Sequence, residues 1–370
     1  MKVLNKLAVL GVTASMLAGG LMLAGPASAE PVTGGYAATG SDTLQDVMNA
    51  LANGTSITGS TVRVSAAGRN FGNFDAFGSL AIQTKPSGPY FTRPSGSGAG
   101  VNSLRASITG SNYGTPAKSI TGQVDIARSS SGPGTDASAT GQLVYVPFAR
   151  DAVAFAYKAA DSAAATVLGS LTTAQLTAIY SADTPTTISG ITIHPRLPQS
   201  ASGTRKFFLG AIGVSTVGGA VPAIDKTTAG MPENDASVLT DVATYGVNEI
   251  IPFSVASWVA QSNGAAPSTI GATGVLIGSP TGVAPFTGSG SALVPNSTYY
   301  TGATWGRDTY LVVQLARVTS GDALYDASLA GLVTTLTSYG TFATTPGAVK
   351  TKFGFLAPST TATQRAFATL

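Results

Sequence analysis

Apolar residues recur at helical spacing in several short segments, each of which begins or ends near glycine, serine or threonine. This spacing predicts helices over 44–51, 101–108, 173–179, 204–212 and 238–245. Short runs that alternate or are apolar throughout predict β-strands at 36–39, 61–65, 124–127 and 188–193, and the run 250–261 predicts a strand followed by a helix. Helices and strands therefore interleave, which favours an α/β fold with mostly parallel strands. In such folds ligands bind where strand ends meet helix starts.

Three further segments bear on the domain organisation. Two apolar, β-prone runs at 143–147 and 153–157 stand close together, and we interpret them as a crossing between two lobes, with a hinge there. The segment 310–318 fits a buried strand or a helix, and its periodicity does not decide between them. The glycine-rich stretch 264–291 has no clear period and is expected to form strands and loops.

Residues 1–29 have the pattern of an export signal. Lys2 and Lys6 precede a short apolar run, and Ala27-Ser28-Ala29 forms a small-x-small cleavage site. We therefore expect a mature chain that starts at Glu30 and is secreted, or periplasmic if the host has an outer membrane. No later apolar stretch is long enough to span a bilayer, so we expect no membrane insertion of the mature chain.

The composition excludes several kinds of site. The chain has no cysteine, which rules out disulfides, thiolate metal sites and a cysteine-linked lipid anchor. Charged residues make up only 10%, and the formal net charge of +3 falls to +1 without Lys2 and Lys6. A nucleic-acid partner is therefore not expected.

Four turns share one chemical design, in which glycine allows close backbone approach and a hydroxyl adds a hydrogen-bond donor. They lie at 40–43, 95–100, 128–132 and 202–205, and a helix is expected to start at three of them. Free N–H groups and the positive dipole end at a helix start can hold a small oxyanion. Ordinary helix caps have the same residue types, so any one turn taken alone favours a structural role. Arg196 or Arg205 could add a charge-assisted pair.

The motifs GSDT, GSGAG, DIARSSSGP, LPQSASGTRKFF and FGFLAPST occur in the order typical of phosphate-binding proteins, the substrate-binding components of ABC-type phosphate uptake systems. The chain resembles that family over nearly its whole mature length, and its actinobacterial members most closely. The resemblance implies a type 2 periplasmic-binding fold, in which two α/β lobes close about a hinge on an anion in the cleft. Lobe 1 would comprise 30–147 and 292–370, and lobe 2 would comprise 148–291.

The resemblance also implies a set of ligand-binding positions. The hydroxyl, amide and glycine positions carried over are Thr43, the Leu44 amide, Ser97, Ser202, Gly203 and Thr204. The family arginine corresponds to Arg196, which stands two residues further from the SGT motif than usual. Arg205 and Arg128 are therefore rival candidates for the cation.

Ser130 is the sharpest departure from the family pattern, which offers an aspartate at this turn. A carboxylate there accepts the proton of phosphate and repels sulfate, whereas a hydroxyl can both donate and accept. The choice between phosphate and sulfate is therefore open, with Asp42 or Asp125 as a substitute acceptor. A second departure is the Ala29-Glu30 junction, where lipid-anchored relatives carry cysteine.

These observations predict a secreted solute-binding protein that captures a tetrahedral oxyanion, inorganic phosphate first, and passes it to an ABC permease. We expect no catalysis and no cofactor or metal, because the chain has His194 as its one histidine and no G-x-S-x-G motif. The alternative is a cell-surface or structural protein on a binding-protein fold. The aromatic residues Trp258, Trp305, Phe207 and Phe208 are assigned to packing.

Overall fold

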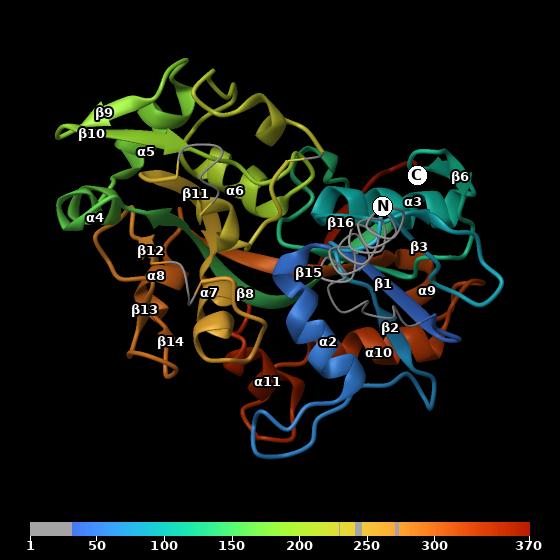
Figure 1. The fold of residues 1–370 in the computed structure, drawn as a ribbon. Coiled ribbons are helices and arrows are strands. Elements are labelled where there is room, and N and C mark those ends of the chain that lie inside the picture. Colours follow the sequence, from blue (N-terminus) through green and yellow to red (C-terminus); the bar gives the residue numbers. More distant parts are fainter. Residues whose placement is uncertain (1–31, 229, 241–245, 271–273) are drawn as a thin grey trace, which may run out of the picture. The chain divides into compact units, whose positions relative to one another are not determined.

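A mixed β-sheet forms the centre of the computed structural model, which describes residues 32–228, 230–240, 246–270 and 274–370 (Figure 1). In the described residues the sheet has the strand order β2-β1-β7-β15-β8-β11-β10-β9, with β12 and β16 also paired to β8. Its strands are β1 (Tyr36–Gly40), β2 (Phe71–Asn73), β7 (Ile126–Ser129), β8 (Leu143–Lys158), β9 (Thr186–Ile188), β10 (Ile191–Pro195), β11 (Glu249–Ser254), β12 (Val275–Gly278), β15 (Gly306–Gln314) and β16 (Gln364–Ala366).

Helices and small hairpins surround this sheet. The α-helices are α2 (Gln45–Asn53), α3 (Ser97–Thr109), α4 (Ser162–Gly169), α5 (Thr173–Ser181), α6 (Gly203–Ala211), α7 (Val255–Ser262), α8 (Ser297–Thr301), α9 (Leu315–Val318), α10 (Ala327–Thr337) and α11 (Pro346–Lys352). The 3₁₀ helices are η1 (Asp42–Leu44), η2 (Gly134–Asp136), η3 (Ala223–Lys226) and η4 (Ala236–Thr240). The hairpins pair β3 (Ala81–Ile82) with β4 (Phe91–Thr92), β5 (Asn112–Tyr113) with β6 (Lys118–Ser119), and β13 (Phe286–Thr287) with β14 (Val294–Pro295).

The α/β class is confirmed, but the expectation of mostly parallel strands is wrong. Strand β1 is parallel to β2 and β7, and β10 is parallel to β11. Strand β8 pairs antiparallel with β11, β12, β15 and β16. The reason is that β8 and β15 run along each other through the middle of the sheet in opposite directions, so the strands beside them are joined through antiparallel pairs.

Strand β8 is one continuous strand of 16 residues, not the two separate runs predicted from the sequence. Its pairing with β15 shifts by one residue, because Thr309 is opposite Ala149 while Tyr310 is opposite Pro147. Phe148 is therefore an extra residue on β8, and such a bulge bends and twists a strand locally. In Figure 1, β8 and β15 run between the green and yellow elements β9–β11 and α4–α6 and the blue and teal elements β1, β2 and α3.

Buried apolar side chains form three clusters within the compact unit 32–370. One cluster packs α5, α6, β10 and β11 against the second part of β8, and it includes Trp258, Trp305 and Phe208, which confirms their packing role. The other two clusters lie around β1, β7 and the first part of β8, one with α2 and α10 and the other with α3. The predicted lobe boundaries stay a prediction.

Most of the predicted elements are present, with two corrections. The segment 61–65 is not a strand: Val62 and Val64 are buried, but among the described residues the ladder contact of this segment is limited to an isolated bridge between Val62 and Thr55. The ambiguous segment 310–318 is both alternatives in turn, since β15 ends at Gln314 and α9 follows at once. The predicted signal and residues 241–245 of the predicted helix 238–245 lie outside the described residues.

Candidate functional site

The four glycine-and-hydroxyl turns meet at one place in the fold. Thr43 Oγ1 lies 3.4 Å from Thr204 Oγ1, and Ser97 Oγ lies 3.2 Å from Ser130 Oγ. A Cβ on Gly203 would clash with both serine hydroxyls, so only glycine lets the start of α6 approach them. We call Thr43, Ser97, Ser130, Ser202 and Thr204 the hydroxyl cluster; all five are buried.

The start of helix α6 is the part of the site with the features of an anion-binding helix N-terminus. Ser202 caps the helix by accepting a hydrogen bond from the Arg205 backbone N–H, which orders the first turn. Thr204, in that first turn, is fully buried and presents both its hydroxyl and its backbone N–H to the site. The partial positive charge of a helix N-terminus therefore faces the hydroxyl cluster.

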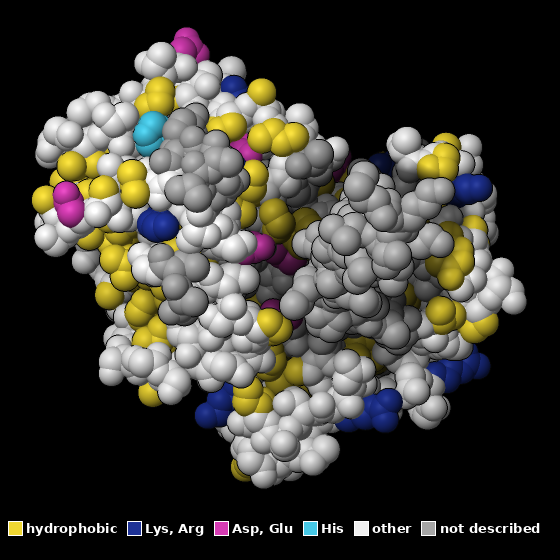
Figure 2. All heavy atoms as spheres, viewed as in Figure 1, with side chains coloured by type: hydrophobic (Ala, Val, Ile, Leu, Met, Phe, Trp, Pro, Cys, Tyr) yellow, Lys and Arg dark blue, Asp and Glu magenta, His cyan; other side chains and the backbone are white. Residues whose placement is uncertain are grey.

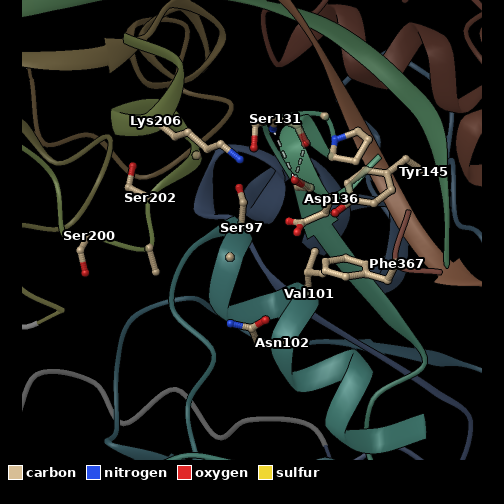
Figure 3. A pocket seen from close by; sticks show the side chains of 16 residues that line it. Ser97, Val101, Asn102, Ser131, Asp136, Tyr145, Ser200, Ser202, Lys206 and Phe367 are labelled. Atoms are coloured by element: carbon tan, nitrogen blue, oxygen red, sulfur yellow. Dashed lines mark hydrogen bonds between the residues drawn. The ribbon is translucent and has the colours of Figure 1, made fainter. Parts of the chain in front are cut away.

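Hydrogen bonds to backbone carbonyls hold the neighbouring turns together. The Gly98 N–H, in the first turn of α3, donates to the Ala201 carbonyl at 3.2 Å, and Gln199 Nε2 donates to the Ser95 carbonyl at 3.0 Å. A cavity of about 220 Å³ opens beside this contact. In Figure 3 the Lys206 side chain from α6 points across it toward Ser131 and Ser97.

Arg307 is the arginine whose guanidinium reaches the hydroxyl cluster, and the sequence analysis missed it. Nη2 donates to Thr204 Oγ1 at 2.9 Å and lies 3.5 Å from Thr43 Oγ1. The residue is only 4% exposed, and its Nη1 has no hydrogen-bond partner among the described residues. A buried donor without a partner is costly, which points to a missing acceptor at this position.

The register of β8 and β15 places Arg307. Each strand carries an Arg-Asp dipeptide, and antiparallel pairing sets Arg307 opposite Asp151 and Asp308 opposite Arg150. Arg307 forms an ion pair with Asp151 at 2.8 Å, and Arg150 forms one with Asp308 at 3.1 Å. Because side chains alternate along a strand, the two ion pairs lie on opposite faces of the sheet.

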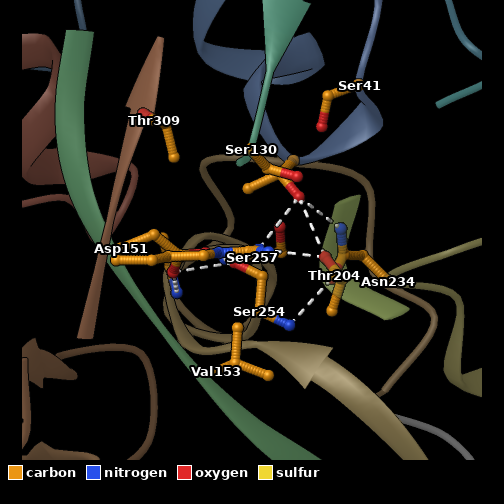
Figure 4. A network of polar contacts seen from close by, with 12 residues as sticks. Ser41, Ser130, Asp151, Val153, Thr204, Asn234, Ser254, Ser257 and Thr309 are labelled. Atoms are coloured by element: carbon orange, nitrogen blue, oxygen red, sulfur yellow. Dashed lines mark hydrogen bonds and ion pairs between the residues drawn. The ribbon is translucent and has the colours of Figure 1, made fainter. Parts of the chain in front are cut away.

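Asp151 positions the Arg307 guanidinium and is itself held at the start of α7. Its Oδ2 accepts from Arg307 Nε and Nη2, while Oδ1 accepts from Ser254 Oγ at 2.9 Å and from the Ala256 backbone N–H at 3.0 Å. Figure 4 shows this network beside Thr204 and Asn234.

The three arginines considered from the sequence have other partners. Arg128 is fully buried and donates to the carbonyls of Ser41 and Gly40. Arg196 pairs with the carboxylates of Asp225 at 2.8 Å and Glu249 at 3.1 Å. Arg205 donates to the carbonyls of Pro198 and Asp225.

The other predicted positions, Leu44, Asp42 and Asp125, differ in whether they lie at the hydroxyl cluster. Leu44 follows Thr43 in η1, and its side chain is fully buried in the apolar cluster around α2. Asp125 pairs with Lys85 and Arg317 away from the hydroxyl cluster, whereas Asp42 lies beside it.

A buried carboxylate, Glu233, already contacts the start of α6. One of its oxygens, Oε2, accepts from Ser202 Oγ and from the Thr204 backbone N–H at 3.1 Å. Burial would raise the pKa of Glu233, but hydrogen bonds from Asp42 and Ser202 and the charge of Arg307 lower it. Burial and the neighbouring Glu233 raise the pKa of Asp42 well above its usual value. Asp42 therefore keeps its proton to higher pH than Glu233 does.

The loop 231–235 that carries Glu233 is bonded to both sides of the site. Asn234 Nδ2 donates to Asp42 Oδ1 and Thr43 Oγ1, each at 3.2 Å, and its Oδ1 accepts from the Ser254 backbone N–H at 2.9 Å. Asp42, Asp46, Glu233 and Asp235 line a second cavity, of about 210 Å³. Figure 2 shows acidic side chains in the central hollow of this face, with most of the visible Lys and Arg side chains at its periphery.

The sequence contained one signal for Arg307 and none for Glu233. The Arg-Asp dipeptides interrupt two strongly apolar strands, where unpaired charges are costly, so each required a partner. Glu233 lies in a loop without periodicity, and its role depends on contacts that only the fold creates.

No helix in the described residues has the length and apolar character needed to cross a membrane.

Comparisons with solved structures give several similar chains. Structural similarity extends to an ABC-type phosphate transport receptor from Vibrio cholerae, with 16% identity, 88% of this chain and 100% of that chain covered, and a TM-score of 0.49. A putative phosphate ABC transporter substrate-binding protein with bound phosphate from Clostridium perfringens has 14% identity, coverage of 87% and 98%, and a TM-score of 0.49. A phosphate-binding protein from Stenotrophomonas maltophilia has 14% identity, coverage of 88% and 91%, and a TM-score of 0.48.

No curated protein matches the sequence. The model of a PBP superfamily domain matches residues 25–251, which is more than half of the chain. The chain therefore belongs to the PBP superfamily.

Proposed function

We propose that this protein binds a tetrahedral oxyanion, with inorganic phosphate as the expected ligand, at the hydroxyl cluster and the start of α6. The observation that carries the proposal is the buried Arg307, whose Nη1 lacks a partner in the described residues beside several hydroxyl groups. A dehydrated anion needs fixed donors in place of water, and hydroxyls, helix N–H groups and a guanidinium are such donors. Binding, and not catalysis, is the proposed role.

Each member of the site has a proposed part. Thr43, Ser97, Ser130, Ser202 and Thr204 donate from their hydroxyls, as the turns in which they lie suggest. Gly203 allows the backbone of α6 to approach the ligand. Arg307 supplies the positive charge, in place of the arginines that the resemblance suggested.

The biological setting follows from the family resemblance. We propose a secreted receptor that delivers its ligand to an ABC permease. Phosphate is expected to bind more tightly than sulfate, because an oxygen of the neighbouring Asp42 carboxyl group can accept the proton that phosphate carries and sulfate lacks.

The test is a calorimetric titration of ligand-stripped protein with phosphate and then with sulfate. We expect saturable phosphate binding, weaker sulfate binding, and a loss of phosphate affinity of at least ten-fold in Thr204→Val. The matched control is Thr84→Val, because Thr84 is equally buried and donates to the Gln123 carbonyl instead. Absence of binding heat with both anions in the folded wild-type protein would refute the proposal and favour the surface-protein alternative.

A further inference from the structure

The carboxylate of Glu233 occupies the donors that an oxyanion at the start of α6 would need. Its Oε2 accepts from Ser202 Oγ and the Thr204 backbone N–H, and Oε1 lies 3.4 Å from Ser41 Oγ. Glu233 is only 2% exposed, so these bonds replace solvent at the helix terminus. A carboxylate and a phosphate oxygen make the same kind of bond to such donors.

A further donor beside the helix start indicates a place for an anion as well as a helix cap. Ser202 accepts from the Arg205 N–H at the start of α6, a helix of nine residues, and Glu233 accepts from the Thr204 N–H. Arg307 acts electrostatically on Glu233, yet its buried Nη1 makes no hydrogen bond to any described residue. The site therefore has more donor capacity than Glu233 uses.

A second anion cannot be added while Glu233 stays in place. The Arg307 charge is already paired with Asp151 at 2.8 Å, so Glu233 brings the local balance to one net negative charge. A phosphate beside it would compete for the Thr204 N–H and would meet a like charge at close range in a buried site.

We infer that Glu233 is a resident anion that the ligand must displace, so that oxyanion binding exchanges one anion for another at the start of α6. This inference rests on the proposed function and concerns the regulation of the same site. Glu233 and the adjacent Asn234 bridge the elements around the site. Displacement of Glu233 releases the loop 231–235 from the Ser202 and Thr204 donors, and the affinity for the ligand is lowered by the strength of those bonds.

The direct test compares phosphate affinity in the wild type, Glu233→Gln and Asp235→Asn by calorimetry. Glutamine keeps the shape of the side chain and removes its charge, so Glu233→Gln should bind inorganic phosphate at least ten-fold more tightly. Asp235→Asn removes an equal charge two positions away, where the side chain contacts Ser237 and not α6. Its affinity should change by no more than about three-fold, as expected for a screened charge.

The outcomes separate this inference from the proposed function. Unchanged or weaker phosphate binding in Glu233→Gln, with binding retained in the wild type, overturns the inference and leaves the proposed function standing. Equal gains in both variants also overturn it, because a general charge effect would then explain them. No binding in either folded protein overturns both.

A measurement on the wild-type protein keeps the inference testable if Glu233→Gln does not fold. Amide hydrogen exchange followed with and without saturating phosphate should show faster exchange in a peptide covering 231–238. A peptide covering 203–211 should exchange more slowly, because the ligand now accepts from the α6 N–H groups. Slower exchange in both peptides would mean that Glu233 stays on the helix, which overturns the inference.

Discussion

Removal of the Asp151 carboxylate should destabilise the protein and make its stability depend more strongly on phosphate. In Asp151→Asn the guanidinium of Arg307 loses the acceptor of its 3.0 Å and 2.8 Å hydrogen bonds. The asparagine Oδ1 can still accept from Ser254 Oγ and the Ala256 N–H, so the loss is confined to the ion pair.

The burial of the pair sets the size of this effect. Asp151 is fully buried and Arg307 is 4% exposed, so neither group regains solvent when its partner is removed. Breaking a buried ion pair on one side typically costs about 3–5 kcal/mol, because the remaining buried charge loses the oppositely charged group that was hydrogen-bonded to it. An anion bound at the site would compensate that charge, and ligand at 100 times its Kd contributes about 2.7 kcal/mol of stability even without such coupling. Phosphate should therefore stabilise Asp151→Asn by at least about 1 kcal/mol more than the wild type.

Urea denaturation with and without phosphate measures both effects, since the free energy of unfolding is read from the midpoint and slope. Asp308→Asn is the matched control, because it breaks the neighbouring ion pair with Arg150 on the opposite face of the sheet. This variant should lose stability without any additional response to phosphate. An equal response to phosphate in the two variants would refute the placement of Arg307 at the anion site.

Two further predictions concern packing and pH. Gly203→Ala should abolish phosphate binding and lower the free energy of unfolding by about 1–3 kcal/mol or more, because the new methyl group collides with Ser97 Oγ and Ser130 Oγ. The control is Gly210→Ala in the same helix, where open space surrounds the new methyl group, and it should raise the free energy of unfolding by about 0.5–1 kcal/mol. Loss of phosphate binding in both variants would contradict the argument. Burial lowers the pKa of Lys350 from 10.5 to about 7, so the unfolded chain binds more protons between these values and stability should rise with pH across this window by a few kcal/mol. Urea melts from pH 7 to pH 10 should show this rise in the wild type and lose it in Lys350→Met, and an unchanged slope in Lys350→Met would contradict it.

Local chemistry explains which parts of the site were predictable from the sequence. The start of α6 depends on a Ser-Gly-Thr motif whose cap, close-approach glycine and hydroxyl are within three residues of one another. The turn before α3 has the same local design, with Gly96 at a φ of 91°, a value that favours glycine. Such features depend on neighbouring residues, so local sequence was enough to propose the turns, and the family resemblance then gave Ser97, Ser202, Gly203 and Thr204 as positions within them.

The arginine at the site was missed because nearness in sequence was used in place of register. Arg128 and Arg205 lie in the turns, but backbone carbonyls at the ends of nearby segments engage their guanidinium groups. Arg307 reaches the same place from 103 positions beyond Thr204, through a strand pairing that the apolar pattern of 310–318 did not predict. The antiparallel direction of β8 and β15 is the missing information, because it aligns each Arg-Asp dipeptide with the other.

Glu233 shows a different limit of sequence reasoning, and it bears on why position 130 has a serine where the family pattern has an aspartate. The family pattern puts an acceptor in the turn after β7, where this chain has a serine, and the sequence analysis looked for a substitute among Asp42 and Asp125. The structure has two carboxyl groups beside the cluster, Asp42 and Glu233, and burial together with the neighbouring Glu233 raises the pKa of Asp42. The hydroxyl of Ser130 lies 3.2 Å from Ser97 Oγ. An aspartate in place of Ser130 would add a third carboxyl group to the same buried region. Because like charges close together raise the cost of ionising each group, a neutral serine at this position is compatible with Glu233 in the same buried region.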